Sequence, residues 1–271
     1  MKTITIANQK GGVGKSAVAR LLAHYLVRIG RRVLTVDLDH QANLSEPLML
    51  SQRAEVACWS ASHIFSGEPV TLPEEAGLVL VPADAEGLLG LERQPDRHND
   101  FATAFRGFLR SQVGRFDACI IDTNPNPDIR LVCALVSSNY VLSPIQLNQE
   151  AIAGIVGLVN HPRVGIQRFK KQLNPALELL GILPTLVEPT PFQKDNFAQL
   201  SAQYAHLLIR HPDGNGFAAI PKRSVIAEAQ ASGALLWEMK KSSARETWRE
   251  IEPTLRTLAT RLSLYKAPTH A

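Results

Sequence analysis

The feature that most constrains the fold is a glycine-rich turn between a strand and a helix, in the stretch ANQKGGVGKSAVARLL at residues 7 to 22. Residues 3 to 8 (TITIAN) alternate apolar and polar side chains, as a strand does. The pattern that follows has the spacing of one apolar helix face, made of Val18, Leu21, Leu22, Tyr25, Leu26 and Ile29, and Gly30 ends it. Because backbone N–H groups at such a turn point inward, the chain is predicted to begin with a phosphate-binding strand–turn–helix unit.

Alternating strand and helix patterns continue along the chain. Short apolar runs predict buried strands at 33–36, 78–82, 118–121, 140–144 and 179–187. Helical patterns lie between or after them at 99–112, 129–137, 150–160 and 192–207. This order predicts an α/β fold, an open and mostly parallel twisted sheet with helices on both faces. We expect residues 1–264 to form a single domain, since no linker divides them, and 265–271 to be a loose tail.

The C-terminal region predicts one more helix. Pro253 lies inside its pattern and is expected to kink or divide it. The residues expected to face the core are Trp248, Ile251, Leu255, Leu258 and Leu262. The stretch 50–77 carries no pattern from which an element is predicted.

The composition favours a folded protein of the cytoplasm. Hydrophobic residues make up 45% of the chain and charged residues 20%, far from the composition of disordered chains. Cys58, Cys119 and Cys133 form no CxxC pair, so we interpret them as reduced thiols. Residues 1–30 lack a signal pattern, and no run of about 18 apolar residues occurs, so neither secretion nor a membrane span is expected.

The glycine-rich turn has most of the residues of a nucleotide-binding phosphate loop. Its backbone, over Gly11, Gly12, Val13, Gly14, Lys15, Ser16 and Ala17, is predicted to surround the phosphates of a nucleotide. Lys15 would reach the β and γ oxygens, and the Ser16 hydroxyl would bind Mg²⁺. The usual pattern begins with glycine, whereas this chain has Gln9 there and a second lysine, Lys10, just after it.

The sequence KGGVGKS resembles the deviant Walker A signature of the ParA/MinD group of P-loop ATPases. The resemblance implies a P-loop NTPase fold, ATP as the nucleotide and a homodimer that encloses two nucleotides. In that group the extra lysine, which matches Lys10, reaches the phosphates bound by the other subunit. The two lysines of one turn would then serve two different nucleotides.

Carboxylates follow two of the predicted strands. In VLTVDLDHQAN, Asp37 and Asp39 are two residues apart, so their side chains are expected on the same side of the strand. The group reads VDxDPQxN here, which implies that Asp39 orients the attacking water and that Asp37 lies near the metal; His40 replaces the usual proline. Asp122 ends the run FDACIID as a Walker B carboxylate does, and is predicted to support Mg²⁺.

Other segments extend the resemblance from residue 2 to about residue 262. The group's IDxPP motif has a double proline, where this chain reads Asn124-Pro125-Asn126-Pro127. Residues 142–154 and 220–233 also match segments of the group, and the loop around Pro221 is expected close to the nucleotide base.

Partners are implied by the resemblance together with the distribution of basic residues. ParA-type members bind nonspecific DNA when they hold ATP and depend on a ParB-like or other centromere-binding protein that stimulates hydrolysis. Such a protein would segregate a plasmid, a chromosome or another cargo and would be nucleoid-associated in the cytoplasm. Since the first strand is predicted to begin at residue 3, we expect no helix-turn-helix region before it. The net charge is +4, and the candidate DNA-binding residues are Arg163, Arg168, Lys170, Lys171, Lys222 and Arg223.

Three other functions are compatible with parts of the sequence. A MinD-like protein would place a C-terminal amphipathic helix on the membrane, but the leucines of 255–265 continue a core-facing pattern, so membrane binding is the second choice. A regulator switched by ATP with negligible turnover is a third interpretation. An iron–sulfur reductase would need a second cysteine besides Cys133 at a dimer axis, and none lies at a matching position.

Overall fold

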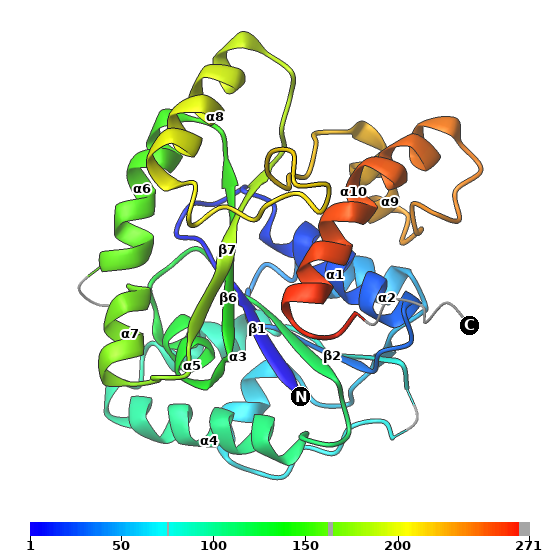
Figure 1. Ribbon diagram of the computed structural model, residues 1–271. Coiled ribbons are helices and arrows are strands. Elements are labelled where there is room, and N and C mark those ends of the chain that lie inside the picture. The colour runs from blue at the N-terminus through cyan, green and yellow to red at the C-terminus, as the bar shows by residue number, and fades with distance from the viewer. Residues whose placement is uncertain (75, 162–164, 266–271) are drawn as a thin grey trace.

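The computed structural model describes residues 1–74, 76–161 and 165–265, and it contains one parallel sheet. The sheet has seven strands in the order β3-β4-β2-β5-β1-β6-β7. The strands are β1 (Lys2–Ile6), β2 (Val33–Asp37), β3 (Glu55–Val56), β4 (Leu78–Val81), β5 (Ala118–Asp122), β6 (Tyr140–Gln146) and β7 (Glu178–Thr185). Figure 1 shows the sheet passing through the middle of the molecule, with helices on both sides. The predicted fold class is therefore confirmed.

Helices fill the connections between the strands. Five of them carry the residues discussed below: α1 (Lys15–Arg28), α5 (Ile129–Ser137), α6 (Gln149–Asn160), α7 (Ile166–Gln172) and α9 (Ser224–Ala231). The others are α2 (Ser45–Leu50), α3 (Ala85–Leu91), α4 (His98–Ser111), α8 (Pro191–Tyr204) and α10 (Ser242–Arg261), with short 3₁₀ helices at Ala61–Ser66 and Pro95–Arg97.

The core has a large cluster on each face of the sheet. Ile4 and Ile6 of β1 pack with the apolar faces of α1 and α10, whereas Cys119 and Ile121 of β5 pack with α4 and α5. The alternation of side chains along a strand explains this division. The central strands are therefore covered on both sides, as their apolar composition predicts.

The sheet order sets the place of the functional residues. β1 lies between β5 and β6, and β2 lies on the other side of β5. In register, Ile6 is opposite Asp122, which is opposite Asp37. Since parallel strands end at the same edge, the turn after β1 meets both carboxylates there.

The C-terminal helix differs from the prediction. α10 runs unbroken from Ser242 to Arg261 with Pro253 inside it, so the expected division is wrong. Proline removes one backbone donor, but Ile251 and Leu255 on its two sides are fully buried in the same cluster. Packing on the core stabilises the helix on both sides of Pro253 despite the missing hydrogen bond.

Two further sequence expectations can be compared with the structure. Within the described residues, no helix combines the length and apolarity needed to cross a membrane. The stretch 50–77 supplies the two-residue edge strand β3 and a 3₁₀ helix, where Phe65 stacks on Phe105 at 5.2 Å. The tail expected over 265–271 lies, apart from Tyr265, outside the described residues.

Candidate nucleotide-binding site

The turn between β1 and α1 has the backbone of a phosphate loop. Gly12 and Gly14 adopt φ angles of 72° and 82°, in the left-handed region where glycine is favoured. Gly14 also caps the N-terminus of α1, so the positive end of this helix faces the turn. A Cβ atom added at Gly11 or Gly12 would meet no described atom within 4 Å, so this side of the turn is open to a ligand.

The ends of β6 and β7 hold the loop in place. The Thr185 hydroxyl donates to the Val13 carbonyl at 2.7 Å, and the Gln146 amide donates to the Gly12 carbonyl at 3.0 Å. On the other side, Asn8 accepts from the Lys10 backbone N–H at 2.8 Å and donates to the Pro144 carbonyl at 2.8 Å. These hydrogen bonds tie the loop to β6 and β7 and so preorganise its backbone.

Lys15 lies inside the loop. Its side chain is buried, with Nζ 3.4 Å from the Lys10 carbonyl oxygen. Burial lowers the pKa of Lys15, and the charges of Asp122 and Asp39 oppose this effect. The ammonium group is therefore close to two carboxylates and to the space that the loop surrounds.

Asp122 ends β5 at the same edge and is fully buried. Its Oδ1 accepts from the Thr123 backbone N–H at 3.1 Å, but its Oδ2 has no hydrogen-bond partner in the part of the chain that the structure describes. Burial, with Asp37 second, raises the pKa of Asp122, while the Ser16 hydroxyl and Lys15 oppose the rise. An unpaired buried carboxylate oxygen beside a hydroxyl fits a Mg²⁺ ion, whose ligands are oxygens.

Asp37 uses both carboxylate oxygens within the chain. Oδ2 accepts from the Ser45 backbone N–H at 2.8 Å and from its hydroxyl at 2.7 Å, and Oδ1 accepts from the Asp39 N–H at 3.0 Å. Burial raises the pKa of Asp37 to about 6. Asp37 lies opposite Asp122 on the neighbouring strand, and its hydrogen bonds shape the loop that carries Asp39.

Asp39 is the next carboxylate along that loop, and it is 5% exposed. Its Oδ1 accepts from the Gln41 N–H at 3.1 Å and lies 3.6 Å from His40 Nδ1. Since Asp39 raises the pKa of Lys15, it lies within electrostatic reach of the loop lysine. The structure thus brings Lys15, Asp39 and Asp122 together.

Lys10 points away from the loop interior. Its Nζ lies 2.7 Å from Glu150 Oε2 and 3.3 Å from Asn148 Oδ1, at the start of α6. A third of its side chain is exposed. The two lysines of the turn therefore have different surroundings, one buried among carboxylates and one at the rim.

Pro221 lies beside the segment that follows β7. Val187 forms a bridge with Pro221, and the Lys222 N–H donates to the Val187 carbonyl at 2.9 Å. Thr185, two residues before Val187, touches the phosphate loop. The segment around Pro221, which is expected near the nucleotide base, therefore lies at the same edge of the sheet as the phosphate loop.

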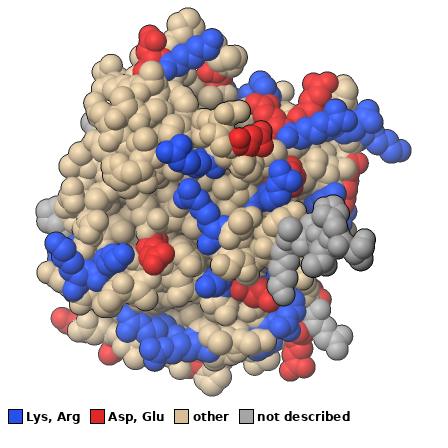
Figure 2. Space-filling view, viewed as in Figure 1, with Lys and Arg blue, Asp and Glu red and all other residues tan. Residues whose placement is uncertain are grey.

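The candidate DNA-binding residues form two separate groups. Arg168, Lys170 and Lys171 lie on α7, whereas Lys222 and Arg223 precede α9 on the other side of the molecule (Figure 1). In Figure 2, basic side chains gather over α7 and along α4, while acidic and basic side chains alternate around α9 and α10. Lys222 pairs with Glu188 at 3.2 Å and Arg223 with Glu250 at 2.9 Å. Arg163 lies outside the described residues.

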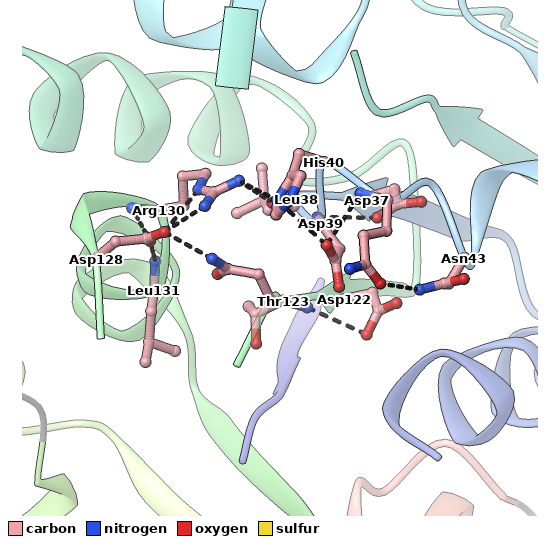
Figure 3. A network of polar contacts seen from close by, with 12 residues as sticks. Asp37, Leu38, Asp39, His40, Asn43, Asp122, Thr123, Asp128, Arg130 and Leu131 are labelled. Atoms are coloured by element: carbon pink, nitrogen blue, oxygen red, sulfur yellow. Dashed lines mark hydrogen bonds and ion pairs between the residues drawn. The ribbon is translucent and has the colours of Figure 1, made fainter. Parts of the chain in front are cut away.

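Several residues of the site were missed from the sequence. Ser45, Gln146 and Thr185 hold the loops, and each is polar at an end of a strand or helix, which is a weak signal. Arg130 lies between Asp128 and His40 in Figure 3 and was also missed. In the sequence it comes shortly after Asn124-Pro125-Asn126-Pro127, and nothing in this pattern predicts that Arg130 faces the loop after β2.

A glycine-rich loop between β1 and α1, an inward lysine and two carboxylates on adjoining strands define a P-loop nucleotide-binding protein. A family model described as "AAA domain" matches residues 1–179. The chain belongs to this family, in the branch of the ParA, Soj and IncC partition proteins.

Individual relatives cover most of the chain. Protein IncC of Escherichia coli is 32% identical over 258 residues, which are 93% of this chain and 67% of that protein. The chromosome-partitioning ATPase Soj of Thermus thermophilus is 33% identical over 240 residues, or 86% of either chain. A structure named cobyrinic acid a,c-diamide synthase, from Mycobacterium smegmatis with a bound ATP analogue and magnesium, is 26% identical with a TM-score of 0.73, covering 100% of this chain and 99% of that one.

Proposed function

We propose that this protein is a ParA-type partition ATPase that dimerises when it binds ATP, binds DNA nonspecifically and hydrolyses ATP when a ParB-like partner stimulates it. The observation that carries the proposal is the different placement of the two loop lysines. Lys15 is buried within electrostatic reach of Asp39 and Asp122, whereas the Lys10 side chain is one-third exposed and pairs with Glu150. Lys15 would bind the triphosphate in the loop of its own chain. Lys10 would then be left to bind the triphosphate held by a second subunit.

The residues of the loop would bind the triphosphate. The backbone over Gly11 to Ala17 and the Lys15 ammonium would neutralise and orient it, with the α1 N-terminus behind them. Ser16 and Asp122 would hold Mg²⁺, and the unpaired Asp122 Oδ2 supports this assignment. When bound, Mg²⁺ would neutralise charge on the β and γ oxygens. The relative that holds an ATP analogue and magnesium supports a site that takes both.

Asp39 and Lys10 would act on the reaction itself. Asp39 would orient a water molecule for attack on the terminal phosphoryl group, because its second carboxylate oxygen is not used by the Gln41 N–H. Lys10 of the opposite subunit would stabilise the charge that develops during transfer. Asp37 would keep Asp39 in place through the Ser45 contacts.

The proposed DNA-binding residues are Arg163, Arg168, Lys170, Lys171, Lys222 and Arg223. Residues 1–264 are proposed to form one domain. A symmetric dimer would present each basic group twice, which gives avidity and a steep dependence on salt. The names of the curated relatives, a chromosome-partitioning ATPase among them, support segregation of a DNA cargo. The protein would then be found with the nucleoid.

A membrane-cycling function receives less support. Leu255, Leu258 and Leu262 of the C-terminal region are fully buried in the core, so this face is not free to lie on a bilayer. The alternative of a regulator without turnover is decided by the experiment below.

The test is multiple-turnover phosphate release with ATP and Mg²⁺, with and without nonspecific DNA and the product of the neighbouring gene. We expect slow turnover that DNA and the second protein accelerate together, and none for Lys15→Ala. Retention on DNA at rising salt, compared with cosedimentation on anionic vesicles, separates the partition from the membrane function. ATP binding without turnover under all conditions would contradict the ATPase and favour the regulator.

A further inference from the structure

We propose that Arg130 and His40 form a positioning pair that holds Asp39 in place for hydrolysis. The pair would restrain the loop after β2 in place of the proline that the resembling group has at the position of His40. The inference rests on the proposed function, in which Asp39 orients the attacking water. It is carried by a chain of contacts between the loop after β2 and the start of α5 (Figure 3).

The first link holds the Arg130 guanidinium. Arg130 is 2% exposed, and its Nε donates to Asp128 Oδ2 at 2.9 Å, with Nη2 bonded to the same oxygen. Asp128 also caps α5 by accepting from the backbone N–H groups of Arg130 and Leu131. Asn124 donates to Asp128 Oδ2 at 2.7 Å. The guanidinium plane is therefore fixed from the side of α5.

The second link joins the guanidinium to the loop after β2. Its other terminal nitrogen, Nη1, donates to the Leu38 carbonyl at 3.3 Å and lies 3.4 Å from His40 Nδ1. Leu38 is the residue between Asp37 and Asp39 in the chain. One end of a fixed cation thus touches the loop on both sides of Asp39.

The third link is the His40 ring. Guanidinium nitrogens only donate, so a hydrogen bond from Arg130 requires an unprotonated Nδ1 and assigns the ring proton to Nε2. The same Nδ1 lies 3.6 Å from Asp39 Oδ1. While Arg130 occupies Nδ1, the ring cannot donate to Asp39 from this nitrogen, and the carboxylate keeps its capacity to accept from water.

The sequence explains why such a pair is needed here. Proline fixes φ at its position, and the resembling group has proline where this chain has His40. The second departure from the group lies at Asn124, whose amide bonds Asp128. His40 and Asn124, the two residues that depart from the group, are therefore connected through Asp128 and Arg130. The contacts of Asn124 can in this way compensate for the proline that is absent at position 40. Since a buried ion pair adds little net stability over apolar packing, a positioning role accounts for Arg130 better than stability does.

The test uses steady-state turnover and the affinity for a fluorescent ATP analogue, with ATP, Mg²⁺ and nonspecific duplex DNA. His40→Ala removes the ring at a position that is one quarter exposed, so its fold should survive. Arg130→Met is combined with Asp128→Asn, which keeps the helix cap and leaves no buried charge unpaired. Each variant is expected to lose turnover about ten- to hundredfold while nucleotide affinity stays within about twofold, because orientation and not binding is impaired.

Two further variants separate positioning from support of the fold. Adding His40→Ala to the Arg130→Met and Asp128→Asn variant should cost nothing more, because the two residues act in one chain. His40→Pro should retain turnover and should make it insensitive to the removal of Arg130. Turnover of His40→Ala within twofold of the parent protein, or losses that multiply in the combined variant, would overturn the inference. Absence of turnover in the parent itself would overturn the proposed function and this inference with it.

Discussion

Lys10 Nζ lies 2.7 Å from Glu150 Oε2, so the lysine assigned to the other subunit's nucleotide is bound by a carboxylate of its own chain. The hydrogen bond from Lys10, and then the lysine charge, lower the pKa of Glu150, so this carboxyl group is ionised near neutral pH. For Lys10 to reach a second nucleotide, this ion pair has to break. In the proposed dimer, the pair would therefore compete with dimerisation.

Replacing Glu150 by glutamine is expected to favour the ATP-bound dimer. The variant keeps the length of the side chain but removes the charge, so Lys10 is released at lower protein concentration; the effect should be modest, since the pair is exposed. Analytical ultracentrifugation with ATP and Mg²⁺ measures it. Glu86→Gln, in the first turn of α3, is the matched control. Weaker self-association of the Glu150 variant would mean that the ion pair belongs to the dimer and does not oppose it.

Lys15→Ala is expected to weaken ATP binding about a hundredfold, because the variant has no buried ammonium group to donate charge-assisted hydrogen bonds to phosphate. Titration with a fluorescent ATP analogue measures the affinity. Lys194→Ala on α8, an exposed lysine away from the loop, should bind as the parent does. If the two variants bound the ATP analogue with equal affinity, Lys15 would not be a nucleotide-binding residue.

Asp122→Asn is expected to stabilise the nucleotide-free protein and to weaken its response to Mg²⁺. Burial raises the pKa of Asp122 above 3.8, its usual value, so its contribution to stability is present at low pH and is lost as pH rises through the folded-state pKa. Thermal unfolding between pH 5 and pH 8 should therefore show a higher midpoint for the variant at pH 8 and a flatter dependence on pH. The stabilisation by ATP and Mg²⁺ together should be smaller than in the parent. A variant less stable than the parent at pH 8 would contradict the conclusion that the buried charge of Asp122 destabilises the folded protein.

The ion pairs before α9 predict opposite effects on DNA binding. Arg223→Ala should weaken binding and reduce the slope of log affinity against log salt by about one for each phosphate that is no longer neutralised. Glu250→Gln should strengthen binding, because Glu250 now neutralises Arg223. Fluorescence anisotropy on duplexes of unrelated sequence, over a range of salt, measures both. If both variants bound DNA as the parent does, the DNA surface would lie elsewhere, and the α7 group would be tested by Lys170→Ala with Lys171→Ala.

The sequence was sufficient to predict the fold class, every strand of the sheet except β3, and the turn between β1 and α1, because these depend on local patterns. Apolar runs such as 118–121 identify buried strands, and parallel strands end at one edge, which places Asp122 beside Ser16. The roles of these residues stay predictions. Pro253 shows the limit of local rules, since core packing on both sides outweighs the preference of one residue.

Contacts between distant segments could not be predicted in the same way. Arg130 reaches a carbonyl 92 residues earlier in the chain, and Thr185 reaches one 172 residues earlier. Neither hydrogen bond leaves a periodic signal. β3 has only two residues, both exposed, so it carries no apolar pattern either. The two basic groups likewise look alike in sequence, and only the fold reveals that they lie on different sides.

Action of Lys10 across a dimer is the central claim, and complementation between two inactive variants tests it directly. Lys10→Ala and Asp39→Ala should each lack turnover alone. In an equimolar mixture, about half of the dimers would be mixed, each with one complete site, so about a quarter of the parent's turnover should return. A mixture as inactive as its two components, with mixed dimers present, would contradict a role for Lys10 at the other subunit's nucleotide.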